Sequence, residues 1–199
     1  MKIARIKAAG LVAGFSGGAP TYLRDFSFTK AVRAQGTGPV KLGFIEDESG
    51  NLAVYGLQKL HAAQLAVKEI NETGGVLGKS VVVVHGDSGE AKEKKLEASF
   101  DALVEKKVDV IIGPSSSVLA ERILPASVKA GIPLISPAAT APRLTALDDD
   151  GMLFRTISSA AMQGTVLAGL ASAGEEARVA VIYFDDDTGR ATAATATAA

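Results

Sequence analysis

Residues 108–140 read VDVIIGPSSSVLAERILPASVKAGIPLISPAAT, and this stretch decides the fold class. Val108–Ile112 is a short apolar run that predicts a buried strand. A Gly-Pro pair then turns the chain, residues 115–129 favour a helix, and residues 132–135 form a second apolar run. Strands that alternate with helices in this way are typical of an α/β fold with a parallel sheet.

The same alternation extends in both directions from this stretch. Further strands are expected at residues 41–45, 80–84 and 179–184, and further helices at residues 90–106 and 161–173. Another helix is expected after the first strand, because apolar residues recur there at spacings of three and four: Leu57, Leu60, Ala63, Val67 and Ile70. The pattern predicts a Rossmann-like parallel sheet covered by helices on both faces.

The composition excludes several classes of function. The chain has 199 residues with 47% hydrophobic residues, which is enough for a substantial core. A net charge of −1, 5% aromatic residues and the absence of Trp argue against a nucleic-acid partner. The absence of Cys excludes disulfides, thiolate catalysis and zinc–thiolate sites. No apolar run approaches the roughly 20 residues that span a bilayer.

The two ends of the chain differ from its regular middle. Residues 1–38 start with basic residues followed by a weakly apolar stretch, so they form either an export signal or a leader outside the fold. Residues 191–199 contain only Ala and Thr, and we interpret them as a frayed or artificial tail that supplies no core face.

Residues 71–80, NETGGVLGKS, end like a phosphate-binding P-loop but do not fit that motif. The motif requires Gly at the position of Thr73, and it leads from a strand into a helix, whereas this segment leads from a helix into a strand. We therefore interpret Gly74 and Gly75 as a turn that ends a helix.

No metal or cofactor site is predicted. His61 and His85, the only two histidines, fall on different predicted elements and have no second ligand at a metal-binding spacing. The acidic runs at residues 148–150 and 185–187 are typical of solvated loops. No catalytic residue is assigned.

Hydroxyl residues follow two successive predicted strands. Three serines, residues 115–117, stand where a helix begins, and Ser136 to Thr140 form the loop after the next strand. Ligands of open α/β sheets bind at these carboxyl ends of the strands. The serines fit two roles, because they can cap the helix or, together with its free amides, hold an anionic group such as a carboxylate.

The sequence resembles the type I periplasmic binding proteins of the branched-chain amino acid class. The resemblance runs from about Lys41 to Ala191 and rests on four stretches: LAVKEINETGGVLGKSVVVVHGD, VDVIIGPSSSVLAERILPASVKAGIPLISPAATAPRLT, FRTISSAAMQGTVLAG and ARVAVIYFDDDTGRA. It implies a two-lobed fold that closes over a ligand. Residues 39–153 would form the first lobe, and residues 154–190 would begin a second, similar lobe.

The resemblance also implies ligand contacts. A serine of the SSS run and the SPAAT loop hold the ligand carboxylate in amino-acid-binding members, which carries the role to Ser116, Ser117, Ala138, Ala139 and Thr140. Tyr55 matches an aromatic position beside the ligand. Two positions depart from the family pattern, Ala160 in place of an acidic residue and Thr188 in place of Tyr.

The function implied by the resemblance is that of an extracytoplasmic, periplasmic solute-binding protein of an ABC importer. Its partners would be a branched-chain-like amino acid, or a related small carboxylate or amide, and the membrane subunits of the transporter. Since family members are about twice as long, we expect a truncated chain that covers the N-terminal half. Two alternatives are a ligand-sensing domain of a receptor or regulator, with the same fold, and a nucleotide-using α/β enzyme.

Overall fold

The computed structural model describes residues 38–49, 53–90, 92–173, 179–185 and 187–198. All but the last residue of the expected leader, residues 1–38, lies outside these ranges. The elements in chain order are β1 (Val40–Glu46), α1 (Ala53–Glu72), β2 (Val81–Asp87), α2 (Lys95–Glu105), β3 (Val110–Ile112), α3 (Ser117–Ala130), β4 (Leu134–Ser136), a 3-10 turn (Pro142–Thr145), β5 (Leu153–Arg155), α4 (Ala160–Ala171) and α5 (Asp187–Ala198).

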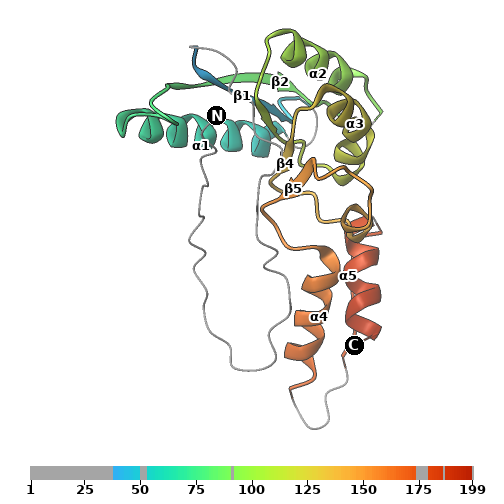
Figure 1. Ribbon diagram of the computed structural model, residues 1–199. Coiled ribbons are helices and arrows are strands. Elements are labelled where there is room, and N and C mark those ends of the chain that lie inside the picture. The colour runs from blue at the N-terminus through green and yellow to red at the C-terminus, as the bar shows by residue number, and fades with distance from the viewer. Residues whose placement is uncertain (1–37, 50–52, 91, 174–178, 186, 199) are drawn as a thin grey trace. The chain divides into compact units, whose positions relative to one another are not determined.

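The five strands form one parallel sheet in the order β2-β1-β3-β4-β5, which confirms the predicted α/β class. The chain leaves β1 toward β2 on one side and leaves β3 toward β4 on the other (Figure 1). The loops after β1 and β3 therefore diverge at a switch point, which is where open α/β sheets bind ligands.

The main hydrophobic core lies between the sheet and the pair α2 and α3, which lie side by side in Figure 1. From the strands it receives Ile45, Ile111 and Leu134, each fully buried. From the helices it receives Leu96, Phe100, Leu103, Leu119, Ile123 and Leu124. Because successive strand residues point to opposite faces, Phe44, Ile112 and Ile135 point to the other face, where α1 packs.

Helix α1 matches the predicted helix, but only part of its predicted apolar face is buried. Leu60 and Val67 are buried, whereas Leu57 and Ile70 are 46% and 38% exposed. The helix begins tightly against the end of β1, since a Cβ atom at Gly56 would lie 1.9 Å from the Asp47 carbonyl oxygen.

The turn predicted at Gly74 and Gly75 is confirmed. The segment leaves α1 and enters β2, and the Gly75 amide donates to the carbonyl of Ile70 at 2.9 Å. Gly75 has φ of +73°, and a side chain there would collide with the Lys79 carbonyl. Its position between a helix and a following strand is the reverse of a P-loop.

One prediction near the C-terminal end is wrong. Residues 179–184, expected as a strand, are exposed and have no strand conformation, because no strand among the described residues pairs with them. A strand that the sequence analysis did not predict, β5, instead adds Phe154 and Arg155 to the sheet beside β4.

The prediction that the Ala/Thr tail is frayed is also wrong. Residues up to Ala198 form helix α5, which packs against α4 (Figure 1). Alanine has the highest helix propensity, and small side chains let the two helices approach closely. A Cβ atom on Gly164 of α4 would lie 2.6 Å from the Thr192 carbonyl oxygen, and Ala193 is buried. Among the described residues, none of the helices has both the length and the hydrophobicity of a membrane span.

Candidate functional site

The loop between β3 and α3 lies directly against the end of β1. Gly113 has φ of +104°, and a Cβ atom there would lie 1.8 Å from the Ile45 carbonyl oxygen. Ser116 then caps α3, with its Oγ accepting from the Leu119 amide at 3.4 Å. One of the two roles proposed for the serines, helix capping, is therefore filled by Ser116.

Ser117 and Ser136 join this loop to the loop after β4. Ser117 Oγ accepts from the Ala141 amide at 3.1 Å. Ser136 Oγ donates to the Pro114 carbonyl at 2.6 Å and accepts from the Ala139 amide at 3.1 Å. The two loops thus form one unit at the carboxyl end of the sheet. A hydroxyl that accepts one bond still carries a proton, so Ser117 can donate to a ligand.

Thr140 links this unit to the last two helices. Its Oγ1 lies 3.1 Å from Oγ1 of Thr188 in α5, and its carbonyl accepts from the Ala160 amide at 2.8 Å. The two positions that depart from the family pattern, Ala160 and Thr188, therefore both contact Thr140. Because Thr140 is only 8% exposed, its hydroxyl is largely committed to this contact.

The remaining predicted residues differ in their placement. Ala139 is fully buried and its amide is bonded to Ser136, while Ala138 is half-buried. Tyr55 lies in the first turn of α1 and is 57% exposed. Ser116, Ser117, Ala138, Ala139 and Thr140 thus lie in the two joined loops, whereas Tyr55 comes from α1.

Sequence reasoning missed a buried polar cluster formed by Glu46, Lys59 and Ser115. Glu46 opens the acidic stretch of residues 46–48, yet it is the last residue of β1 and is fully buried. Its Oε2 lies 3.0 Å from Nζ of Lys59, and the same ammonium donates to Ser115 Oγ. Burial raises the pKa of Glu46, although the neighbouring Ser115 hydroxyl and the charge of Lys59 oppose the rise.

The raised pKa of Glu46 should make the stability of the chain depend on pH, and a substitution at Glu46 should weaken this dependence. Since the folded pKa is raised above the ordinary value of 4.5, the native protein should lose stability as the pH rises from about that value through the folded pKa. Glu46→Gln has no proton to lose there, so its free energy of unfolding should change less over this window. Urea titrations of both proteins between pH 4 and 7 test this, and identical pH slopes would contradict it.

Arg155 of β5 is another residue that sequence reasoning missed. Its Nη1 donates to the carbonyl oxygens of Ala139 and Ala141 at 3.4 and 3.3 Å. These bonds hold the backbone of the loop after β4 in place. The signal was absent from the sequence because β5 has only three residues and shows no periodicity.

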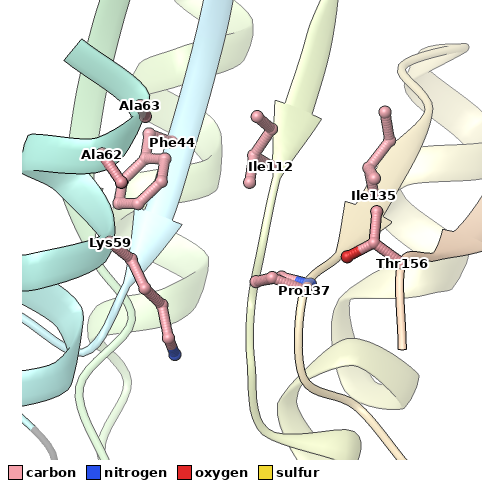
Figure 2. A pocket seen from close by; sticks show the side chains of 8 residues that line it. All are labelled: Phe44, Lys59, Ala62, Ala63, Ile112, Ile135, Pro137 and Thr156. Carbon is pink, nitrogen blue, oxygen red and sulfur yellow. The ribbon is translucent and has the colours of Figure 1, made fainter. Parts of the chain in front are cut away.

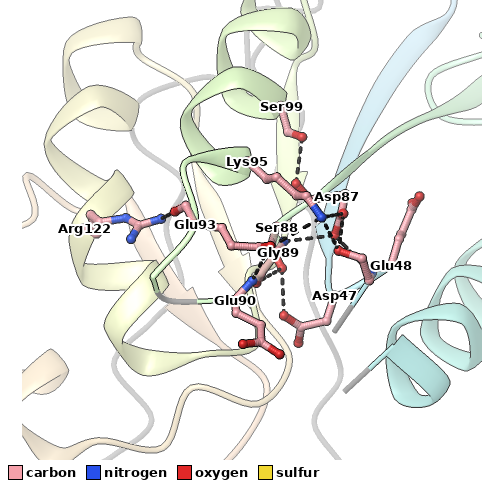
Figure 3. A network of polar contacts seen from close by, with 11 residues as sticks. Asp47, Glu48, Asp87, Ser88, Gly89, Glu90, Glu93, Lys95, Ser99 and Arg122 are labelled. Carbon is pink, nitrogen blue, oxygen red and sulfur yellow. Dashed lines mark hydrogen bonds and ion pairs between the residues drawn. The ribbon is translucent and has the colours of Figure 1, made fainter. Parts of the chain in front are cut away.

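A second polar network ties the ends of β1 and β2 together (Figure 3). The Asp87 carboxylate accepts from the amides of Glu48 and Gly89 at 3.0 and 2.9 Å, and from Ser49 Oγ at 2.6 Å. Lys95 Nζ lies 3.4 Å from the same carboxylate. Burial acts to raise the pKa of Asp87, but these hydrogen bonds outweigh it and lower the pKa.

A pocket of about 290 Å³ lies on the α1 face of the sheet (Figure 2). It is lined by Phe44, Lys59, Ala62, Ala63, Ile112, Ile135, Pro137 and Thr156. None of the six predicted ligand-contact residues lines it. Its lining is almost wholly apolar, and Pro137 and the stem of Lys59 connect it to the two loops. In the part of the chain that the structure describes, no group of three His or acidic residues could hold a metal ion.

The sequence profile of one protein family, described as periplasmic binding protein, matches residues 39–199. The chain belongs to the periplasmic binding protein family. The match covers the whole sheet, both loops and the last two helices, so every residue of the candidate site lies inside the family region.

Individual Leu/Ile/Val-binding proteins match as well. The chain is 36% identical over 107 residues to Leu/Ile/Val-binding protein BraC3 of Rhizobium johnstonii, covering 53% of this chain and 29% of that protein. It is 28% identical over 172 residues to Leu/Ile/Val-binding protein homolog 7 of Brucella abortus, covering 82% and 43%.

The fold also matches a solved substrate-binding protein. The branched-chain amino acid transporter substrate-binding protein LivJ of Streptococcus pneumoniae, solved in complex with isoleucine, superposes with a TM-score of 0.68 at 35% identity. The superposition covers 80% of this chain and 46% of LivJ. The chain spans less than half the length of each of these three relatives.

Proposed function

We propose that this chain is the carboxylate-binding part of an extracytoplasmic solute-binding protein that serves an ABC importer. The ligand would be a small carboxylate, and an aliphatic amino acid is the first candidate. The transporter partners would be membrane subunits that receive the ligand. The observation that carries the proposal is the joining of two loops at the carboxyl end of the sheet, with Ser117 at the start of α3.

The physical reason lies in the first turn of α3. The helix has 14 residues, and the free amides at its start carry a partial positive charge that favours an anionic group. Ser117 adds a hydroxyl donor at the same place, while the half-buried Ala138 leaves room for a ligand to approach the neighbouring backbone. These groups suit a carboxylate. The names of the relatives, which mention Leu, Ile, Val and isoleucine, supply the side-chain class to test first.

Ligand binding can be tested by thermal shift and calorimetry on this chain. Isoleucine, leucine, valine and benzoate are compared with 2-methylbutylamine, which is isoleucine without its carboxylate. We expect at least one carboxylate to raise the melting temperature and the amine to have no effect. The proposal fails if no carboxylate binds, or if the amine binds as well as isoleucine.

Ser117→Ala should weaken binding of the responsive carboxylate by about tenfold or more, because a hydrogen bond to a charged group is lost. Ser172→Ala is the matched control, since Ser172 ends α4 and bonds only within its own helix turn. A urea titration of Ser117→Ala must accompany the measurement, because the Ala141 amide also loses its partner. Unchanged affinity in Ser117→Ala would remove Ser117 from the site.

A further inference from the structure

Glu46, Lys59 and Ser115 connect three separate elements. Glu46 ends β1, Lys59 lies in the second turn of α1, and Ser115 opens the serine run before α3. The Lys59 ammonium contacts both of the others, since its Nζ lies 3.0 Å from Glu46 Oε2 and donates to Ser115 Oγ. Figure 2 shows the Lys59 side chain extending from α1 along the border of the pocket.

Stability alone does not explain this cluster. Glu46 is fully buried, and its second oxygen, Oε1, has no hydrogen-bond partner among the described residues. A buried ion pair is often no more stabilising than apolar side chains of similar size, because both charges lose their hydration. Lys59 itself lines the apolar pocket, so an apolar side chain at its position would have apolar neighbours. A geometric role for the pair fits these facts better than an energetic one.

The element that the cluster holds in place is the loop before α3. Gly113 brings the loop backbone against the end of β1, where the position of its missing Cβ lies 3.1 Å from Glu46 Oε1. Two residues later Lys59 holds the Ser115 hydroxyl, and the next two residues are the cap Ser116 and the candidate donor Ser117. The loop is therefore fixed on one side by Lys59 and on the other by the bond from Ala141 to Ser117.

We propose that Lys59, oriented by Glu46, is a positioning residue for the carboxylate site. It holds Ser115 so that the Ser117 hydroxyl and the first amides of α3 face the same ligand oxygen atoms. This inference rests on the proposed function. A loop that is ordered before the ligand arrives pays less entropy on binding, so a free loop should bind more weakly.

The test separates a positioning role from a stabilising one. In Glu46→Leu/Lys59→Met both charges are replaced by apolar side chains, so the urea midpoint should equal or exceed that of the native chain. Hydrogen exchange of amides 115–119 should nevertheless become about tenfold faster, and binding of the responsive carboxylate about tenfold weaker. Lys68→Met/Glu72→Leu, which removes an exposed ion pair of the same helix, is the matched control and should change neither.

Ser115→Ala is a second, milder variant that guards against misfolding of the double variant. It removes only the loop side of the contact, so faster exchange should be confined to residues 115–119 and should not reach β1 or α1. Native exchange rates at these amides in either variant would overturn the inference. The exchange experiment needs no ligand. A native chain that binds no carboxylate would instead overturn the proposed function.

Discussion

Gly113→Ala is expected to lower the free energy of unfolding by about 3–5 kcal/mol, because the substitution adds a backbone strain to a steric collision. The φ of +104° at Gly113 is unfavourable for any residue with a side chain. The new methyl group would also lie 1.8 Å from the Ile45 carbonyl oxygen. That oxygen belongs to a central strand, so it cannot rotate away, and the whole loop must move.

Gly131→Ala is the matched control for this prediction. Gly131 ends α3 with φ of +69°, and nothing lies within 4 Å of the position that its Cβ would occupy. The control therefore contains the backbone strain without the collision and should cost about 1 kcal/mol. Urea titrations of both variants give the steric part as a difference. Equal losses in the two variants would show that the β3–α3 loop is not pressed against β1.

The sequence predicted those elements whose signal is local. Four of the strands and the helices α1 to α4 carry apolar runs or helical spacing within their own residues, and the structure has them within a few positions. The strand expected at residues 179–184 failed because a strand also needs a neighbour, which local pattern does not supply. The prediction for the Ala/Thr tail failed for the opposite reason. Its alanines favour a helix, and a helix of small residues can pack against a small residue such as Gly164 without an apolar stripe of its own.

The candidate site shows the same division. The serine run and the loop after β4 could be predicted because both follow recognisable strands. Glu46 could not, because its neighbours Asp47 and Glu48 make the local sequence look like a solvated turn. Its burial depends on Lys59, 13 residues later, and on Ser115, which lies 56 residues beyond Lys59. Only the fold brings these three residues together.

Asp87→Asn is expected to lower the free energy of unfolding at pH 7 by about 2 kcal/mol, because several hydrogen bonds to a charged acceptor are weakened at once. Asp87 pairs with Glu46 at the carboxyl ends of β2 and β1, and its carboxylate holds the amides of Glu48 and Gly89. An asparagine can accept through only one of its side-chain atoms, so part of this network loses its acceptor and Lys95 loses a charge partner.

The lowered pKa of Asp87 determines how the effect of Asp87→Asn depends on pH. The folded pKa of Asp87 lies below the ordinary value of 3.8, so its contribution to stability is fully present above about that pH and is lost as the pH falls through the folded pKa. The difference between the native chain and Asp87→Asn should therefore be constant near neutrality and shrink in acid. Asp101→Asn, at an exposed position of α2, should change stability little at any pH. If the Asp87→Asn deficit persisted undiminished at the lowest pH at which the chain remains folded, the ionised carboxylate would not be what joins β1 to β2. The network of Figure 3 would then be stabilised by the packing of its side chains and not by the charge of Asp87.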